Sequence, residues 1–138
     1  FGIGSDSNVL IGLADELRQL EYSQRLAHRA RNVLARPGQS NGRALFSAAL
    51  DGGAAALGAG PSQLGAGAAA DFVSLDASRP SLAGKRGDAI LDTWIFAGGA
   101  AVDCVWVHGE KLVEAGRHLR REAIAGRFRT AMEELSRN

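Results

Sequence analysis

The sequence contains little of what several classes of protein require. It has one cysteine, Cys104, which excludes an internal disulfide and a cysteine-rich zinc site and is typical of a reducing compartment. No apolar run reaches the roughly 18 residues of a membrane span, and no charged-then-apolar leader opens the chain. The formal net charge is only +1, which argues against nucleic-acid binding as the main task. We therefore expect a cytoplasmic protein that has neither a membrane nor a nucleic acid as its partner.

What the sequence does contain is enough apolar side chain to build a core. The chain has 138 residues, of which 46% are hydrophobic and 22% are charged, so it is not a disordered tail. It opens on Phe1-Gly2-Ile3-Gly4 without an initiator Met, and residues 1–5 suit the end of a buried strand. A buried parallel strand needs partners on both sides, and this sequence offers none. Either a partner chain supplies the missing strand or this chain is a fragment of a longer one, and we expect the fragment.

Two stretches in the first half have the apolar period of a helix. Leucines and alanines recur at three- and four-residue steps over residues 13–34, and Pro37-Gly38 ends the pattern. A second helix begins where Ser40 or Asn41 can cap it, and it runs to about residue 57 with Gly58 as its stop.

The second half is predicted to be mainly antiparallel strands followed by one helix. The hairpin between the last two strands has Gly109-Glu110 as its two-residue loop, with glycine first as a type II′ turn requires. Residues 122–136 form the helix, with apolar side chains along one face. The predicted strands are 71–76, 89–96, 102–107 and 112–115, and the apolar face of the helix carries Ile124, Phe128, Met132 and Leu135. The fold class is therefore α/β.

Asp6 has the most suggestive position for chemistry. It follows the predicted strand at residues 1–5 and lies within Gly4-Ser5-Asp6-Ser7-Asn8. Barrel enzymes place catalytic carboxylates just past the C-terminal ends of their strands. From spacing alone, an aspartate that caps a helix or stabilises a turn is the more frequent explanation.

Other candidate groups are better explained by structure than by catalysis. The three histidines lack the spacing of metal ligands. Cys104 is predicted to be a small core residue. Residues 65–70 match the letters of a dinucleotide fingerprint, but a strand follows them where a helix is required. A group of C-terminal arginines suits a solvated helix face better than an RNA or an acidic partner. The histidines are His28, His108 and His118, and the arginines are Arg117, Arg120, Arg121, Arg127 and Arg129.

Read as a whole, the chain resembles the C-terminal part of the amidohydrolase superfamily, and most closely its N-formimino-L-glutamate deiminases. Gly4-Ser5-Asp6-Ser7 and Ala70-Asp71-Phe72-Val73 are typical of the superfamily, and the helix with Leu20-Glu21-Tyr22-Ser23-Gln24-Arg25-Leu26 points to this branch. Further similar segments are Asp15 to Leu20, Arg31 to Ala35, Asp92 to Phe96, Val105 to Gly109 and Gly116 to His118.

The resemblance implies a metal-dependent (β/α)8 barrel joined to a small β-sandwich. Residues 1–59 would be the eighth barrel strand and the helices after it, residues 60–118 part of the sandwich, and residues 119–138 a helix that packs back on the barrel. Asp6 would be the catalytic aspartate that also contacts a Zn²⁺ ion. The activity implied is hydrolysis of N-formimino-L-glutamate to N-formyl-L-glutamate and ammonia in histidine degradation, by an enzyme that is commonly a homodimer.

The sequence also departs from this family in what it lacks. The histidine ligands of the earlier barrel strands and the glutamate that assists protonation are absent, and a catalytic zinc needs about three protein ligands. We therefore expect these 138 residues to be inactive alone. Two alternatives stay open: another amidohydrolase-type deaminase acting on guanine, cytosine or adenosine, and a non-catalytic sandwich module that has lost the barrel.

Overall fold

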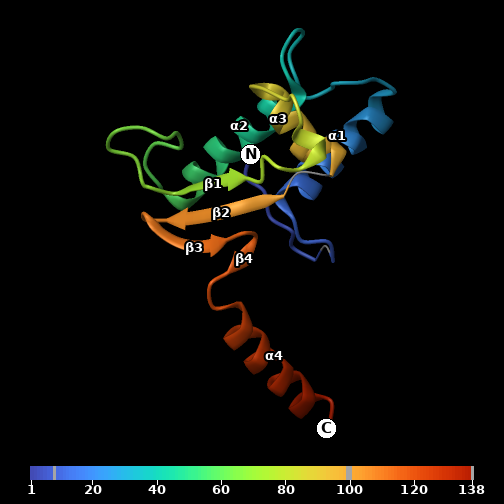
Figure 1. Ribbon diagram of the computed structural model, residues 1–138. Coiled ribbons are helices and arrows are strands. Elements are labelled where there is room, and N and C mark those ends of the chain that lie inside the picture. Colours follow the sequence, from blue (N-terminus) through green and yellow to red (C-terminus); the bar gives the residue numbers. More distant parts are fainter. Residues whose placement is uncertain (8, 99–100, 138) are drawn as a thin grey trace.

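The computed structural model describes residues 1–7, 9–98 and 101–137. Helices and a four-stranded antiparallel sheet make up a mixed α/β structure, as predicted, with the sheet beside the helices (Figure 1). The helices are α1 (Leu13–His28), α2 (Asn41–Leu57), the 3₁₀ turn η1 (Pro80–Leu82), α3 (Asp88–Asp92), the π-helical η2 (Thr93–Ala97) and α4 (Arg121–Leu135). The strands are β1 (Phe72–Leu75), β2 (Val102–Val107), β3 (Glu110–Glu114) and β4 (Arg117–His118).

Helix α1 ends six residues before the predicted position of Leu34. Its C-cap residue, Arg29, adopts the left-handed conformation with φ of 49°, and Asn32 does the same with φ of 53°. The apolar stripe of the sequence therefore continues past the end of the helix into a loop. The predicted helix over 13–34 was therefore too long at its C-terminal end. Leu34 has the spacing of the apolar stripe, but it lies in the loop, where the backbone turns back toward α1.

Helix α2 has the bounds that its local signals predict. The side chain of Ser40 accepts a hydrogen bond from the backbone N–H of Arg43 at 3.0 Å, as an N-cap does. Gly58 ends the helix with φ of 61°, a left-handed conformation that glycine adopts without the steric cost of a Cβ. Both ends of α2 were therefore readable from the sequence.

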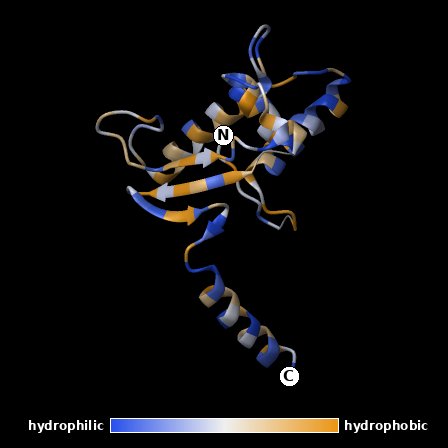
Figure 2. Ribbon diagram, in the orientation of Figure 1, coloured by the Kyte–Doolittle hydropathy of each residue, from blue (hydrophilic) through white to orange (hydrophobic). Residues whose placement is uncertain are grey.

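The predicted strand over 89–96 was wrong, because this segment forms α3 and η2. Ile95 is fully buried and Trp94 nearly so, and they pack with Leu17 of α1 and Leu45 of α2. Only a helical backbone turns these neighbouring apolar side chains toward two helices at once. Figure 2 shows this mixture of apolar and polar residues on the helices around the core.

The sheet has the order β1-β2-β3-β4, with every neighbouring pair antiparallel. Val107 pairs with Glu110, so the hairpin loop is His108-Gly109 and not the predicted Gly109-Glu110. Both loop residues have positive φ, 49° and 78°. That is the pattern of a type I′ turn, which matches the right-handed twist of the strands as the predicted type II′ turn also does.

Residues 1–5, expected as a barrel strand, form no strand in this structure. A strand is held by a neighbouring strand, and the described part of the chain places none beside this segment. The segment instead lies against α2 at Gly52, where an added Cβ would collide with the backbone of Phe1.

Helix α4 confirms the helix predicted over 122–136. It extends away from the sheet and the other helices (Figure 1), and none of its residues is buried. The predicted packing of residues 119–138 on a barrel stays a prediction, since no barrel is present in these residues.

Candidate functional site

Asp6 lies in an exposed turn just before α1. Its φ is 44°, a left-handed conformation that aspartate and asparagine adopt more readily than other residues with a Cβ. The following Asn8 lies outside the described residues. This placement agrees with a turn aspartate, and it leaves the carboxylate accessible to a substrate or a metal.

Asp6 belongs to no complete metal-binding group in the part of the chain that the structure describes. Over residues 1–7, 9–98 and 101–137, no group of three or more histidine, cysteine, aspartate or glutamate side chains is placed to hold a metal ion. A catalytic zinc site needs about three protein ligands. The residues present therefore do not form a zinc site, and Asp6 would contribute at most one ligand to a site completed from elsewhere.

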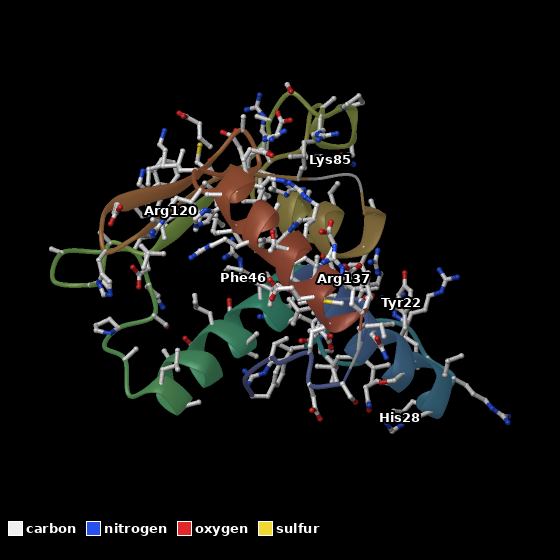
Figure 3. All side chains as sticks on the ribbon, turned by 90° about the horizontal axis from the view of Figure 1, so that it is seen from below. Tyr22, His28, Phe46, Lys85, Arg120 and Arg137 are labelled. Atoms are coloured by element: carbon white, nitrogen blue, oxygen red, sulfur yellow. The ribbon has the colours of Figure 1, made fainter. Side chains whose placement is uncertain are left out.

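The other titratable candidates are dispersed. His28 lies at the outer end of α1 (Figure 3), His108 is in the β2–β3 turn, and the Nδ1 atom of His118 accepts the backbone N–H of Arg120 at 3.0 Å. Cys104 is buried on β2, as predicted for a core residue. The glycine- and alanine-rich residues 65–70 lie in the connection before β1 and open no helix.

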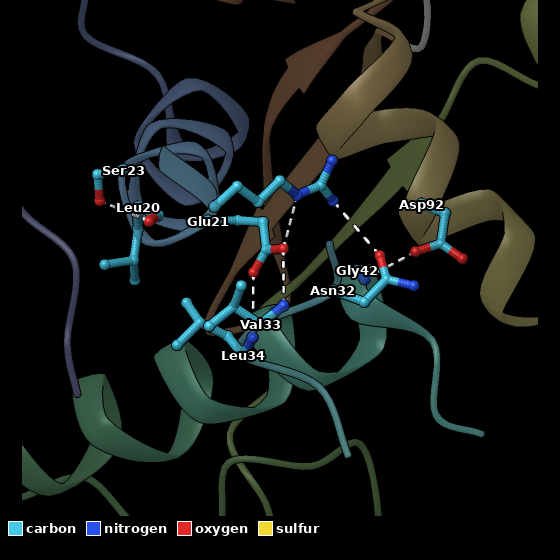
Figure 4. Close-up of polar contacts among 9 residues, drawn as sticks. Leu20, Glu21, Ser23, Asn32, Val33, Leu34, Gly42 and Asp92 are labelled. Carbon is cyan, nitrogen blue, oxygen red and sulfur yellow. Dashed lines mark hydrogen bonds and ion pairs between the residues drawn. The ribbon is translucent and has the colours of Figure 1, made fainter. Parts of the chain in front are cut away.

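A buried polar cluster around Glu21 was not predicted from the sequence. Glu21 is fully buried on α1. Its carboxylate accepts hydrogen bonds from Nε of Arg25 at 2.7 Å, from the backbone N–H of Val33 at 3.1 Å and from that of Leu34 at 3.2 Å (Figure 4). Together these bonds hold the loop after α1 against the helix that precedes it.

The ionisation of Glu21 follows from this geometry. Burial acts to raise the pKa of the carboxyl, but the hydrogen bonds from Arg25 and from the two backbone N–H groups outweigh burial. The pKa of Glu21 is therefore lowered below its ordinary value, and the group is a carboxylate at neutral pH. The side chain of Asn41, buried nearby, also contributes to the lowering although it makes no hydrogen bond of good geometry.

Arg25 joins Glu21 to an open, polar cavity of about 450 Å³. Its guanidinium lies 5.2 Å from the ring centre of Tyr22 and 5.3 Å from that of Phe96, within the range of cation–π attraction. It also donates to the side-chain oxygen of Asn32 at 3.4 Å. Because Glu21 neutralises Arg25, the cavity has no uncompensated positive charge from Arg25. The contacts of Glu21 and Arg25 instead hold the α1–α2 loop in place.

A second polar contact fixes the other end of that loop. Asp92, the last residue of α3, accepts the backbone N–H of Gly42 at 2.7 Å and the hydroxyl of Ser40 at 3.0 Å. The sequence signal for Glu21 and Arg25 was their spacing of four residues on a helix, which predicts an ion pair. Neither the burial of Glu21 nor its bonds across twelve residues could be read from that spacing.

No family model matches the chain. An amidohydrolase from Brucella melitensis, whose crystal structure is known, is 58% identical to it and superposes with a TM-score of 0.88 over 98% of this chain. The chain is thus similar to the corresponding part of a known amidohydrolase, as the sequence predicted.

A second relative indicates which branch of the amidohydrolases the chain resembles. Formimidoylglutamate deiminase of Pseudomonas aeruginosa is 48% identical over 136 residues, or 97% of this chain. The chain spans only 30% of the length of each of these two relatives. The resemblance to the deiminase branch of the amidohydrolases is therefore confirmed, and it concerns one part of such a protein.

None of the helices in the described residues is both long enough and apolar enough to cross a membrane.

Proposed function

We propose that this chain is the C-terminal part of an amidohydrolase that deiminates N-formimino-L-glutamate to N-formyl-L-glutamate and ammonia, in histidine degradation. The observation that supports this most is the likeness to formimidoylglutamate deiminase along nearly the whole chain. That likeness includes the helix bearing Glu21 and Arg25, whose contacts organise the α1–α2 loop.

In this proposal Asp6 is the catalytic residue. The reaction adds the oxygen of water to the amidine carbon and expels ammonia, so one proton must leave the water and another must reach the departing nitrogen. A carboxylate within hydrogen-bond reach of both groups can accept the first proton and deliver the second. The exposed position of Asp6 in its turn suits such an exchange with a bound substrate.

We further propose that the complete enzyme is zinc-dependent, with its other ligands and its substrate-carboxylate contacts outside this chain. These 138 residues would then be inactive alone. Cytoplasmic location and a homodimeric state of the complete enzyme belong to the same proposal.

The division into barrel and sandwich is likewise proposed. Residues 1–59 would complete a (β/α)8 barrel and residues 60–118 would contribute to a β-sandwich. In support, an apolar groove of about 1070 Å³ lies between the helices and the sheet. The groove is lined in part by Phe46, Leu50, Trp94, Val105 and Trp106. Since the relatives are more than three times longer, the rest of such a chain is available to cover this surface.

Ammonia release by the complete polypeptide tests the proposed activity. The complete protein and this chain alone are assayed on N-formimino-L-glutamate, guanine, cytosine and adenosine. Release from N-formimino-L-glutamate by the complete protein only is the expected result. Release from one of the ring substrates instead would identify another amidohydrolase-type deaminase, and no release from any substrate would favour a non-catalytic module.

A further inference from the structure

Helix α2 contains two adjacent glycines that differ in what surrounds them. Glycine inside a helix lowers the stability of the helix relative to alanine. At Gly53 an added Cβ would meet nothing within 4 Å. At Gly52 it would collide with the carbonyl group of Phe1 and lie 2.7 Å from the backbone nitrogen of the same residue. Gly52 is therefore the position at which the backbone of the N-terminal segment touches α2 (Figure 1).

The N-terminal segment is held at two successive points. At the first point, the atoms that a Cβ on Gly52 would strike belong to the main chain of Phe1, which cannot rotate away as a side chain can. At the second point, Ile3 packs against the core that contains Leu17 and Leu45. A side chain at residue 52 would therefore have to push the whole segment away from α2.

The same segment leads directly to Asp6. Asp6 follows Ile3 by three residues, which span at most about 11 Å of extended chain. On its other side, the turn that contains Asp6 leads to α1, which begins at Leu13. A shift of the backbone at Phe1 and Ile3 is therefore carried along a short stretch to Asp6.

We infer that Gly52 is a positioning residue for the proposed reaction, because it admits the backbone of Phe1 against α2 and so sets where the carboxylate of Asp6 lies. The inference rests on the proposed function, in which Asp6 exchanges protons with the attacking water and the departing nitrogen. Such transfers need the carboxylate within about 2.6–3.2 Å of each group. A misplacement of about 1 Å is enough to lower turnover by about 10²-fold.

Alanine substitutions in the complete polypeptide test this role. Gly52→Ala is expected to lower kcat for N-formimino-L-glutamate by about 10–100-fold. Its KM is expected to stay unchanged, because the contacts to the substrate carboxylates are proposed to lie outside this chain. Gly53→Ala is the matched control, since it makes the same change one residue further along α2 without a collision, and both constants are expected to keep their wild-type values. Urea denaturation and bound zinc, measured on each sample, refer the rates to folded and loaded enzyme.

A double-mutant cycle separates positioning of Asp6 from a general loosening of the protein. In the Asp6→Asn background, the carboxylate that Gly52 is inferred to position is absent. Adding Gly52→Ala to that background is therefore expected to lower kcat by less than about twofold. A residue with a purely structural role acts independently of Asp6. Equal effects of Gly52→Ala in the two backgrounds would therefore overturn the inference.

A second variant applies the same test if Gly52→Ala does not fold. Ile3→Ala releases the other fixed point of the segment without creating a collision. It is expected to lower kcat at unchanged KM and to lose this effect in the Asp6→Asn background. Normal kcat in the folded variant, beside normal turnover by the wild type, would overturn the inference and leave the proposed function intact. Absence of ammonia release by the wild-type enzyme would instead refute the proposed function, and with it the inference.

Discussion

The carboxylate of Glu21 accepts the backbone N–H of Val33 at 3.1 Å, across twelve residues of chain. One residue of α1 thus fixes a loop that contains no regular secondary structure of its own. The backbone N–H groups of such a loop need hydrogen-bond partners when the loop packs against the protein. A buried carboxylate that takes two of them, together with Arg25, serves as that partner.

Removal of the Glu21 carboxylate is expected to destabilise the fold strongly. In Glu21→Ala, the guanidinium of Arg25 and the N–H groups of Val33 and Leu34 all lose their acceptor. Arg25 is partly exposed and can turn to water, but each backbone N–H left without its acceptor costs about 1–3 kcal/mol in free energy of unfolding. Urea denaturation measures this, and hydrogen exchange at Val33 and Leu34 is expected to rise at the same time.

A control variant tests whether the loss of stability in Glu21→Ala comes from the burial of the carboxylate or from the loss of any paired carboxylate. Glu114→Gln removes a carboxylate that pairs with Lys111 at 3.0 Å on the surface. Exposed ion pairs contribute about 0–1 kcal/mol, so this variant is expected to remain close to the wild-type stability. Equal losses of stability in Glu21→Ala and Glu114→Gln would contradict the role assigned to the buried cluster.

The lowered pKa of Glu21 predicts how stability depends on pH. A carboxyl whose pKa is lower in the folded than in the unfolded protein stabilises the fold above its unfolded pKa, and that contribution is lost as pH falls through the folded pKa. The unfolded value is near 4.5. The free-energy difference between the wild type and Glu21→Gln is therefore expected to be constant from neutral pH down to about 5 and to shrink below 4.5.

Denaturation midpoints of both proteins between pH 3 and 7 check this prediction. Other carboxyls titrate in the same range, Asp76 among them, whose pKa is lowered mainly by hydrogen bonds from Ser78. Because Asp76 is unchanged in both proteins, its effect cancels in the difference. A difference that grows with acid would show that the pKa of Glu21 is raised and not lowered.

Two glycines of α2 are expected to respond to alanine in opposite directions. At Gly42, an added Cβ would lie 2.7 Å from the backbone nitrogen of Asp92, so α3 must shift, at a cost of about 1–3 kcal/mol. At Gly53, an added Cβ would meet nothing within 4 Å. Alanine there is expected to stabilise the helix by about 0.5–1 kcal/mol. Thermal or urea unfolding of Gly42→Ala and Gly53→Ala compares the two, and stabilisation by both would show that α3 does not pack at Gly42.

Elements whose form depends on contacts between neighbouring residues were predicted correctly from the sequence, and elements whose form depends on contacts with other helices were not. Helix α2 was predicted with its bounds because Ser40 and Gly58 act within their own turns of backbone. Residues 89–96 were predicted as a strand because Trp94, Ile95 and Phe96 are consecutive and apolar. Their helical form is decided by Leu17 and Leu45 on other helices, which no local pattern reveals.

The same distinction applies to the candidate site. Asp6 was identified from a short motif and a resemblance, and the structure adds its exposed, left-handed turn. The structure adds no further metal ligands to Asp6, since residues 1–7, 9–98 and 101–137 hold no group of three or more side chains placed to bind a metal ion. The role of Glu21 needed the structure, because a four-residue spacing to Arg25 looks the same on a solvated helix as on a buried one.

Substitution of Asp6 tests its proposed role in the complete enzyme. Asparagine keeps the size of the side chain and tolerates the φ of 44°, so Asp6→Asn is expected to fold normally. It cannot accept and return a proton at neutral pH, and loss of a general acid–base group lowers turnover by about 10²–10⁴-fold. Steady-state ammonia release measures the loss, and the bound zinc measured on the same sample separates a lost ligand from a lost proton transfer. Asp51→Asn is the control: it removes an exposed carboxylate of α2 that accepts the hydroxyl of Ser62, and it is expected to keep normal turnover. Normal turnover in Asp6→Asn with normal folding would remove Asp6 from the mechanism.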